Sequence, residues 1–133
     1  KKKIKVGNLY AKRDWGYAGD YVEAMWKMLQ NKSPKDYVIG TGKNYSVKNF
    51  IDVATKILNL KTKWRGKGIN EKLINLENNK TIIEIDKKFF RPTEVDTLKG
   101  DFSKAAKELN WKPKTNFTEL VEMMIKADID RKL

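Results

Sequence analysis

Three segments of the chain carry apolar residues at the 3.6-residue spacing of an amphipathic helix. In the first segment, residues 17–31, the apolar stripe consists of Val22, Met25, Trp26 and Leu29. In the second, the predicted inner face is formed by Val47, Phe50, Ile51, Ala54, Ile57 and Leu58. In the last, one face carries Phe117, Leu120, Val121, Met124 and Ile125. The pattern therefore predicts three helices, each with one apolar side.

Local capping signals mark where the later helices begin. Ser46 precedes the second helix, and its hydroxyl suits the N-cap position. Asn116 is followed three residues later by Glu119, which is the spacing of a capping box. Either Asp101 or Ser103 suits the cap of a further, shorter helix.

Short apolar runs between turn residues predict strands at 4–8, 37–39, 61–65 and 81–85. Glycine and asparagine punctuate 66–79, which has no clear assignment, and Pro92 makes 89–96 a loop. The run Tyr37–Ile39 is apolar on both faces, so it requires a sheet that is covered on both sides. Since the chain offers few strands to pair with it, we expect this run to complete a sheet built elsewhere. The order of elements is mixed α/β, with helices dominating.

Length and composition favour a soluble protein. The 133 residues suit one domain or part of one, and a second independent core is not expected. No apolar run approaches the roughly 18 residues that span a bilayer, and no hydrophobic signal region follows the basic residues 1–5, so we expect a cytoplasmic protein without a membrane partner. Cys and His are both absent, which excludes disulfides, thiolate metal sites and an imidazole general base.

The formal net charge of +12 raises the question of nucleic acid. Of the 29 basic residues only four are arginine, so 25 are lysine, and these lysines are scattered along the whole chain. Arginine is the favoured reader of bases and phosphates because its guanidinium forms two parallel hydrogen bonds. A dedicated nucleic-acid surface is therefore disfavoured, although a general anion-binding module remains an alternative.

Two segments carry most of the candidate chemistry. The first is the loop 7–16, where Lys12 and Arg13 stand between a predicted strand and a predicted helix and could present a guanidinium to a phosphate. The alternative is an exposed basic loop in which Arg13 pairs with Asp14 or Asp20.

The second segment is Phe89–Asp96. Pro92 stiffens the backbone directly after Arg91, which lowers the entropy lost when the guanidinium binds an anion. Glu94 and Asp96 could accept hydrogen bonds from ribose hydroxyls. The alternative is a proline-stiffened turn with a local ion pair.

Several catalytic motifs are missing. The chain has no GxGxxG fingerprint, no tyrosine followed four residues later by lysine, no Walker A sequence and no Ser/His pair. The sequence Gly40–Gly42 lies between a predicted strand and a predicted helix, but two glycines in a short turn indicate a simple connection. The sequence therefore predicts no catalytic residue and no metal site.

The motifs together resemble one family. The run GNLYAKRDWGYAGDYVEAMWKMLQ is similar to the signature of the GDP-mannose 4,6-dehydratases, and the pieces DYVIGTG, YSVKNF, GKGINE, FFRPTEVDTLKGDFSKAAKELNWKPK and FTELVEMM follow in the family's order. The resemblance covers nearly the whole chain and is weakest between Leu73 and Ile83. Tyr10 stands where the family usually has Asp, and Tyr17 where it usually has His.

The resemblance implies the fold and the reaction. It identifies residues 1–133 as the C-terminal portion of an extended Rossmann-type nucleotide-sugar enzyme, with a small mixed α/β substrate-binding lobe and a segment around 36–60 that packs on the nucleotide-binding domain. The family oxidises the sugar with NADP, eliminates water and returns the hydride, giving GDP-4-dehydro-6-deoxy-D-mannose. NADP and the catalytic groups belong to an N-terminal half, so this chain alone should be inactive. The family also implies a homo-oligomer.

The resemblance also implies the substrate-binding residues. Arg13 and Arg91 would bind the diphosphate of GDP-mannose, Glu94 would accept a ribose hydroxyl, and Asn8 and Lys12 would line the guanine site. Two alternatives remain open, namely a non-catalytic nucleotide-binding or anion-binding module and a sister reductase or epimerase acting on a related nucleotide sugar.

Overall fold

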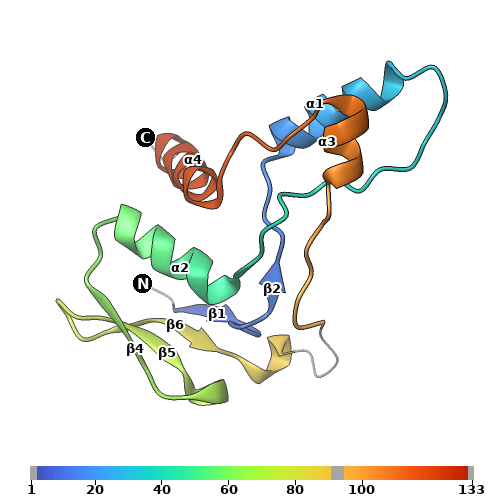
Figure 1. Ribbon diagram of the computed structural model, residues 1–133. Coiled ribbons are helices and arrows are strands. Elements are labelled where there is room, and N and C mark those ends of the chain that lie inside the picture. The colour runs from blue at the N-terminus through green and yellow to red at the C-terminus, as the bar shows by residue number, and fades with distance from the viewer. Residues whose placement is uncertain (1–2, 91–94, 132–133) are drawn as a thin grey trace. The chain divides into compact units, whose positions relative to one another are not determined.

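The computed structural model describes residues 3–90 and 95–131, and within it the chain divides into two compact units (Figure 1). Unit 1 consists of Lys1–Ala11 with Ser46–Asp96, and unit 2 of Lys12–Tyr45 with Thr97–Leu133. Each unit therefore combines two stretches that are far apart in the sequence, and each has its own apolar cluster. Within the described ranges, no helix has the length and apolar character needed to cross a membrane.

Unit 1 is built on a four-stranded sheet. Its strands are β1 (Ile4–Val6), β4 (Thr62–Arg65), β5 (Lys72–Asn75) and β6 (Thr81–Ile85). The spatial order is β1-β6-β5-β4, with β1 parallel to β6 and the other neighbours antiparallel. Two short 3-10 helices, η1 (Gly68–Asn70) and η2 (Lys87–Phe89), complete the unit. The predicted strands at 4–8, 61–65 and 81–85 are thus confirmed, and β5 lies in the region without a clear assignment.

One helix, α2 (Val47–Ile57), packs on this sheet (Figure 1). Ser46 is its N-cap as predicted, since its hydroxyl accepts from Asn49 N–H and Asn49 Oδ1 accepts from Ser46 N–H. Ile51 packs against the sheet in the main apolar cluster of the unit, whose buried members are Leu9, Ile51, Leu73 and Ile83. The predicted inner face is therefore correct at its centre, while Leu58 at the C-cap is 44% exposed.

Unit 2 is mainly helical. It contains α1 (Ala18–Leu29), α3 (Ser103–Leu109), α4 (Phe117–Asp130) and the two-residue strand β2 (Lys12–Arg13), which pairs with β3 (Tyr45–Ser46). Helices α1 and α3 pack together around a cluster of buried residues, namely Ala24, Ala105, Leu109 and Trp111.

Capping residues fix the ends of the helices in unit 2. The N-cap of α3 is Phe102, not Asp101 or Ser103, because Asp101 lies one residue before it, although its carboxylate accepts from Ser103 N–H. The C-cap of α3 is Asn110, which is left-handed with φ of 47°. The capping box of Asn116 and Glu119 begins α4 as predicted. The capping box of α4 was readable from the sequence because its two residues are only three positions apart.

The apolar stripe of α1 lies exposed. Val22, Met25 and Trp26 are 61%, 58% and 61% exposed, and Leu29 is 81% exposed. The buried side of the helix carries Ala24 instead, and this small side chain lets α3 approach closely. The helix is therefore predicted correctly, but its most hydrophobic side has no cover among the residues that the structure describes.

The predicted strand at Tyr37–Ile39 does not form within this chain. Tyr37 and Ile39 pack against the cluster of unit 2, whereas Val38, which points the other way, is 57% exposed. An extended run becomes a strand only when another strand pairs with it, and this run was expected to pair with a sheet built outside the chain, so that expectation stays a prediction.

Candidate functional site

Asn8 lies in the turn that follows β1, in unit 1. Its side-chain oxygen Oδ1 accepts hydrogen bonds from Tyr10 N–H at 2.9 Å and Ala11 N–H at 3.3 Å. Leu9 is 1% exposed in the core, and its carbonyl accepts from Lys48 N–H at 2.9 Å. The turn 8–11 is therefore fixed by its own asparagine, by burial and by the first turn of α2.

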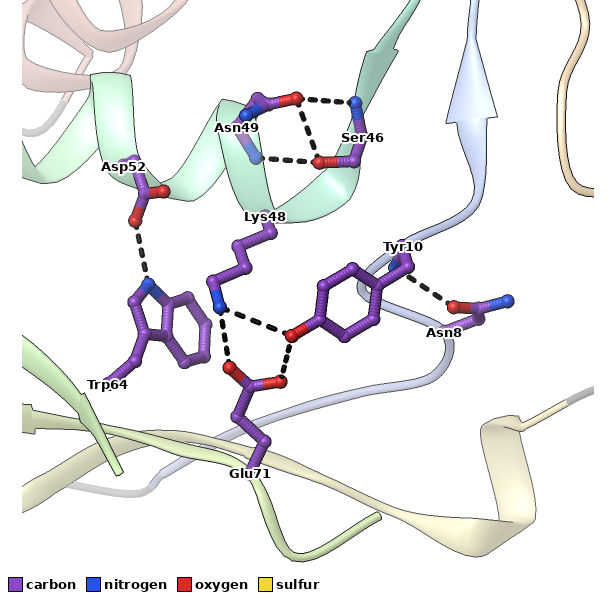
Figure 2. A network of polar contacts seen from close by, with 8 residues as sticks. All are labelled: Asn8, Tyr10, Ser46, Lys48, Asn49, Asp52, Trp64 and Glu71. Atoms are coloured by element: carbon purple, nitrogen blue, oxygen red, sulfur yellow. Dashed lines mark hydrogen bonds and ion pairs between the residues drawn. The ribbon is translucent and has the colours of Figure 1, made fainter. Parts of the chain in front are cut away.

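A polar network adds a side-chain anchor to the same turn (Figure 2). The Tyr10 hydroxyl donates to Glu71 Oε2 at 2.6 Å, and Lys48 Nζ forms an ion pair with Glu71 Oε1 at 2.6 Å. Lys48 Nζ also donates to the Tyr10 hydroxyl oxygen at 3.3 Å. Glu71 lies directly before β5 and is only 4% exposed, so two groups, one from the turn after β1 and one from α2, converge on its buried carboxylate.

The network keeps Lys48 and Glu71 in their charged forms. Burial acts to raise the pKa of Glu71, but the hydrogen bonds from Lys48 and Tyr10 together outweigh it, so this pKa lies below its usual value. Burial likewise acts to lower the pKa of Lys48, and the contacts with Glu71 and Tyr10 raise it above the usual value. At neutral pH the pair is therefore an ammonium and a carboxylate.

Aromatic rings enclose the Lys48 ammonium. Nζ lies 4.9 Å from the centroid of the Trp64 ring and 5.2 Å from that of Tyr10, which is within the range of cation–π attraction. Trp64 is in turn held by a hydrogen bond from its indole N–H to Asp52 at 2.7 Å (Figure 2). Lys48 is thus engaged inside unit 1, which sets it apart from the exposed lysines that give the chain its charge.

In unit 2 the strand β2 holds Lys12 and Arg13. The Lys12 carbonyl accepts from Leu98 N–H at 3.1 Å and from Arg13 Nη1 at 2.8 Å. Lys12 also forms a parallel bridge with Thr97, so the chain that follows the Arg91–Asp96 segment runs beside β2. The backbone at Arg13 is therefore held between two neighbouring stretches of chain.

Asp14, directly after Arg13, binds several backbone groups. Its carboxylate accepts from the N–H groups of Thr41, Gly42 and Gly100 at 2.9–3.2 Å and from the Thr41 hydroxyl at 2.6 Å. The packing is close, since a Cβ at Gly40 would lie 2.9 Å from the Asp14 carboxylate and 3.0 Å from the Gly100 Cα. The Gly40–Gly42 turn is thus shaped to bind Asp14, which fixes the loop after Arg13.

Asp20 has a similar structural role. It is 6% exposed, and its carboxylate accepts from the N–H groups of Lys114 and Thr115, both at 2.9 Å. Its carbonyl accepts from the Trp111 indole at 2.8 Å. Both carboxylates considered as partners for Arg13, Asp14 and Asp20, are thus engaged by backbone N–H groups.

Unit 2 also has a pocket next to this loop. It is lined by aromatic and polar side chains that include Trp15, Tyr45 and Phe117, the last two being stacked with ring centroids 4.0 Å apart. Its volume of about 140 Å³ is below the roughly 300 Å³ at which small-molecule sites begin. Among residues 3–90 and 95–131, no group of three or more acidic side chains suits a metal ion.

The predicted site residues fall in three places. Asn8 belongs to unit 1, Lys12 and Arg13 to unit 2, and Arg91 and Glu94 lie outside the described residues. Sequence reasoning missed the binding partners of Asp14 and the network of Tyr10, Lys48 and Glu71. The only signal for the latter was that Tyr10 departs from the family pattern.

Sequence comparison identifies close relatives of the chain. The family model described as GDP-mannose 4,6 dehydratase matches residues 1–124. The chain is 55% identical to GDP-mannose 4,6 dehydratase of Drosophila melanogaster over 129 residues, which covers 96% of this chain and 32% of that protein. The Homo sapiens protein of the same name is 50% identical over 94% of this chain and 34% of its own length. The chain thus spans about a third of the length of these curated relatives.

Solved structures with the same fold are more distant in sequence. The UDP-glucose 4-epimerase of Thermotoga maritima, determined with UDP-glucose, matches 99% of this chain and 36% of its own with a TM-score of 0.74 at 17% identity. RMD from Pseudomonas aeruginosa, complexed with NADPH, matches 97% of this chain and 36% of its own with a TM-score of 0.72 at 15% identity. The mixed α/β chain therefore has the fold of one part of a larger Rossmann-type enzyme.

Proposed function

This chain belongs to the GDP-mannose 4,6-dehydratase family, and we propose that it is the substrate-binding portion of an enzyme that converts GDP-mannose to GDP-4-dehydro-6-deoxy-D-mannose. Its family membership and its coverage of about a third of each relative carry this proposal. The portion that the relatives have beyond this match would supply the nucleotide-binding domain.

In this proposal the chain binds and orients the sugar nucleotide. Arg13 and Arg91 hold the diphosphate through bidentate hydrogen bonds, and Glu94 accepts from the ribose. Asn8 and Lys12 line the guanine site. Asp14 and Leu98 fix the backbone on both sides of Arg13, which lowers the backbone entropy lost when the side chain binds a ligand. Fixing the diphosphate in turn fixes the sugar, so the contribution to catalysis is orientation.

NADP bound by the N-terminal portion would supply the hydride transfer, and no residue of this chain is assigned to it because the sequence lacks the glycine fingerprint. RMD, which has the same fold, was solved with NADPH. The complete enzyme is proposed to be a cytoplasmic lyase that assembles as a homo-oligomer.

Arginine-to-lysine substitutions test whether Arg13 and Arg91 bind the diphosphate. They are made in a polypeptide that joins residues 1–133 to an N-terminal nucleotide-binding portion, called the joined polypeptide below. Arg13→Lys and Arg91→Lys should each raise the KM for GDP-mannose about tenfold, because a point charge replaces a bidentate fork. Arg65→Lys, an exposed arginine in β4, serves as the matched control and should leave the KM unchanged. Unchanged KM values for both test variants would contradict the assigned role.

Two further measurements separate the alternatives. Titration with GDP-mannose and with random-sequence DNA at two salt concentrations distinguishes a sugar-nucleotide site from a general anion-binding surface, whose affinity falls steeply with salt. Identification of the product distinguishes a dehydratase from a reductase or an epimerase, a distinction that the shared fold cannot make.

A further inference from the structure

We propose that the network of Tyr10, Glu71 and Lys48 is a positioning device that fixes the turn 8–11 so that Asn8 offers only its amide nitrogen to the nucleotide base. The inference rests on the proposed function, in which Asn8 lines the base site. With this orientation of Asn8, the turn favours bases that present hydrogen-bond acceptors to it.

The orientation of the Asn8 amide follows from its partners. Backbone N–H groups can only donate, so the group facing Tyr10 N–H and Ala11 N–H has to be the carbonyl oxygen. Both lone pairs of that oxygen are thereby used. Figure 2 shows the amide nitrogen directed away from the turn, and no described residue accepts a hydrogen bond from it. What Asn8 can offer a ligand is therefore a pair of N–H donors.

The network explains why this orientation should persist. The Tyr10 side chain is 56% exposed, so burial does not hold it in place. Its hydroxyl is instead held by Glu71, whose carboxylate is buried and neutralised by Lys48. Lys48 thus anchors the turn twice, through its ammonium at Tyr10 and through its backbone N–H at the Leu9 carbonyl. Release of Tyr10 would free one side of the hydrogen-bonded turn that orients Asn8.

The chemistry of the bases turns this orientation into selectivity. Guanine presents two acceptors, N7 and O6, on one edge, whereas adenine has an amino group at the position of O6. An amide nitrogen facing that edge can donate to guanine but meets another donor in adenine. An asparagine free to rotate by half a turn could serve either base. A fixed amide is therefore required for discrimination, and its selectivity should fall when the turn is loosened.

Two substitutions in the joined polypeptide test the inference, with GDP and ADP affinities measured by calorimetry. Asn8→Asp keeps the oxygen that accepts from the turn but replaces the donor with an acceptor, so GDP should bind at least about tenfold more weakly. Tyr10→Phe removes only the hydroxyl and should lower the ratio of GDP affinity to ADP affinity about three- to tenfold, the range expected for one hydrogen bond.

Tyr37→Phe is the matched control, because the Tyr37 hydroxyl also donates to a glutamate, Glu108, that is paired with a lysine. It should leave the affinity ratio unchanged. A merely structural role for Tyr10 would reduce the fraction of active protein without altering the ratio. An unaltered ratio in Tyr10→Phe, or unaltered GDP binding in Asn8→Asp, would overturn the inference. A wild-type protein that binds neither GDP nor GDP-mannose would instead overturn the proposed function.

Discussion

At the scale of single residues, the most consequential side chain is a buried carboxylate. Glu71 is 4% exposed and is stabilised by an ammonium and a phenol hydroxyl. A buried charge is tolerated only when it is paired and hydrogen-bonded, so the three residues of the network depend on one another. The sequence could not reveal this, since Tyr10 and Glu71 are 61 positions apart and Glu71 lies in the region without a predicted element.

The depressed pKa of Glu71 makes stability depend on pH. A carboxyl group with a folded-state pKa below its unfolded value of about 4.3 stabilises the protein above that pH and loses this contribution as pH falls through the folded value. Glu71→Gln should therefore cost about 1–3 kcal/mol of unfolding free energy at pH 7 in the joined polypeptide. The difference from wild type should shrink on acidification below about pH 4.

Urea unfolding at pH 7 and at pH 3.5 measures this prediction. Glu108→Gln provides the comparison, because Glu108 has the same pair of partners, a lysine and a tyrosine, at an exposed position. Its effect at pH 7 should be the smaller of the two. A Glu71→Gln penalty that is equal at both pH values would mean that the carboxylate charge does not contribute to stability.

At the scale of secondary-structure elements, local signals were sufficient for the helices and for β1, β4 and β6, but not for β5. The caps at Ser46 and Asn116 were predictable because each is completed within three residues. β5 was not, because its pairing with β4 and β6 is decided by residues elsewhere in the chain. The run Tyr37–Ile39 has the pattern of a strand but no strand to pair with among the described residues, so its expected pairing with a sheet outside the chain stays a prediction.

The exposed stripe of α1 allows a prediction at this scale. Apolar surface of this extent on one helix usually marks an interface, and we propose that the N-terminal portion covers it. Trp26→Ser should make the isolated chain more soluble, because it removes exposed apolar surface. In the joined polypeptide the same change should cost about 3 kcal/mol, because there it removes a buried side chain.

Precipitation of the isolated chain and thermal unfolding of the joined polypeptide measure the two effects of Trp26→Ser. Effects of opposite sign identify the stripe as an interface. Ile129→Ser, in α4, is the matched control because Ile129 is also exposed, at 46%, but lies on another helix. It should not destabilise the joined polypeptide. An equally small effect of Trp26→Ser there would show that the stripe stays exposed.

At the scale of the whole molecule, the family and the fold class were accessible from the sequence, whereas the arrangement of the site was not. The motif around Arg13 is contiguous, so it identified the family directly. The division into two units was not foreseen, because each unit joins stretches separated by more than thirty residues, and such contacts leave no local pattern.

The same division bears on whether residues 1–133 can act alone. Among the residues that the structure describes, each unit has only six buried apolar residues, and α1 and Val38 expose apolar surface. Stability grows with the fraction of surface buried, so the isolated chain should unfold gradually. It should also form no GDP-4-dehydro-6-deoxy-D-mannose, because its sequence predicts no catalytic residue. Calorimetry of the chain alone, and product assays before and after joining it to the N-terminal portion, measure both. A sharp, reversible unfolding transition of the isolated monomer would show that its two small cores suffice, and the exposed apolar surface would then need another explanation than a missing partner.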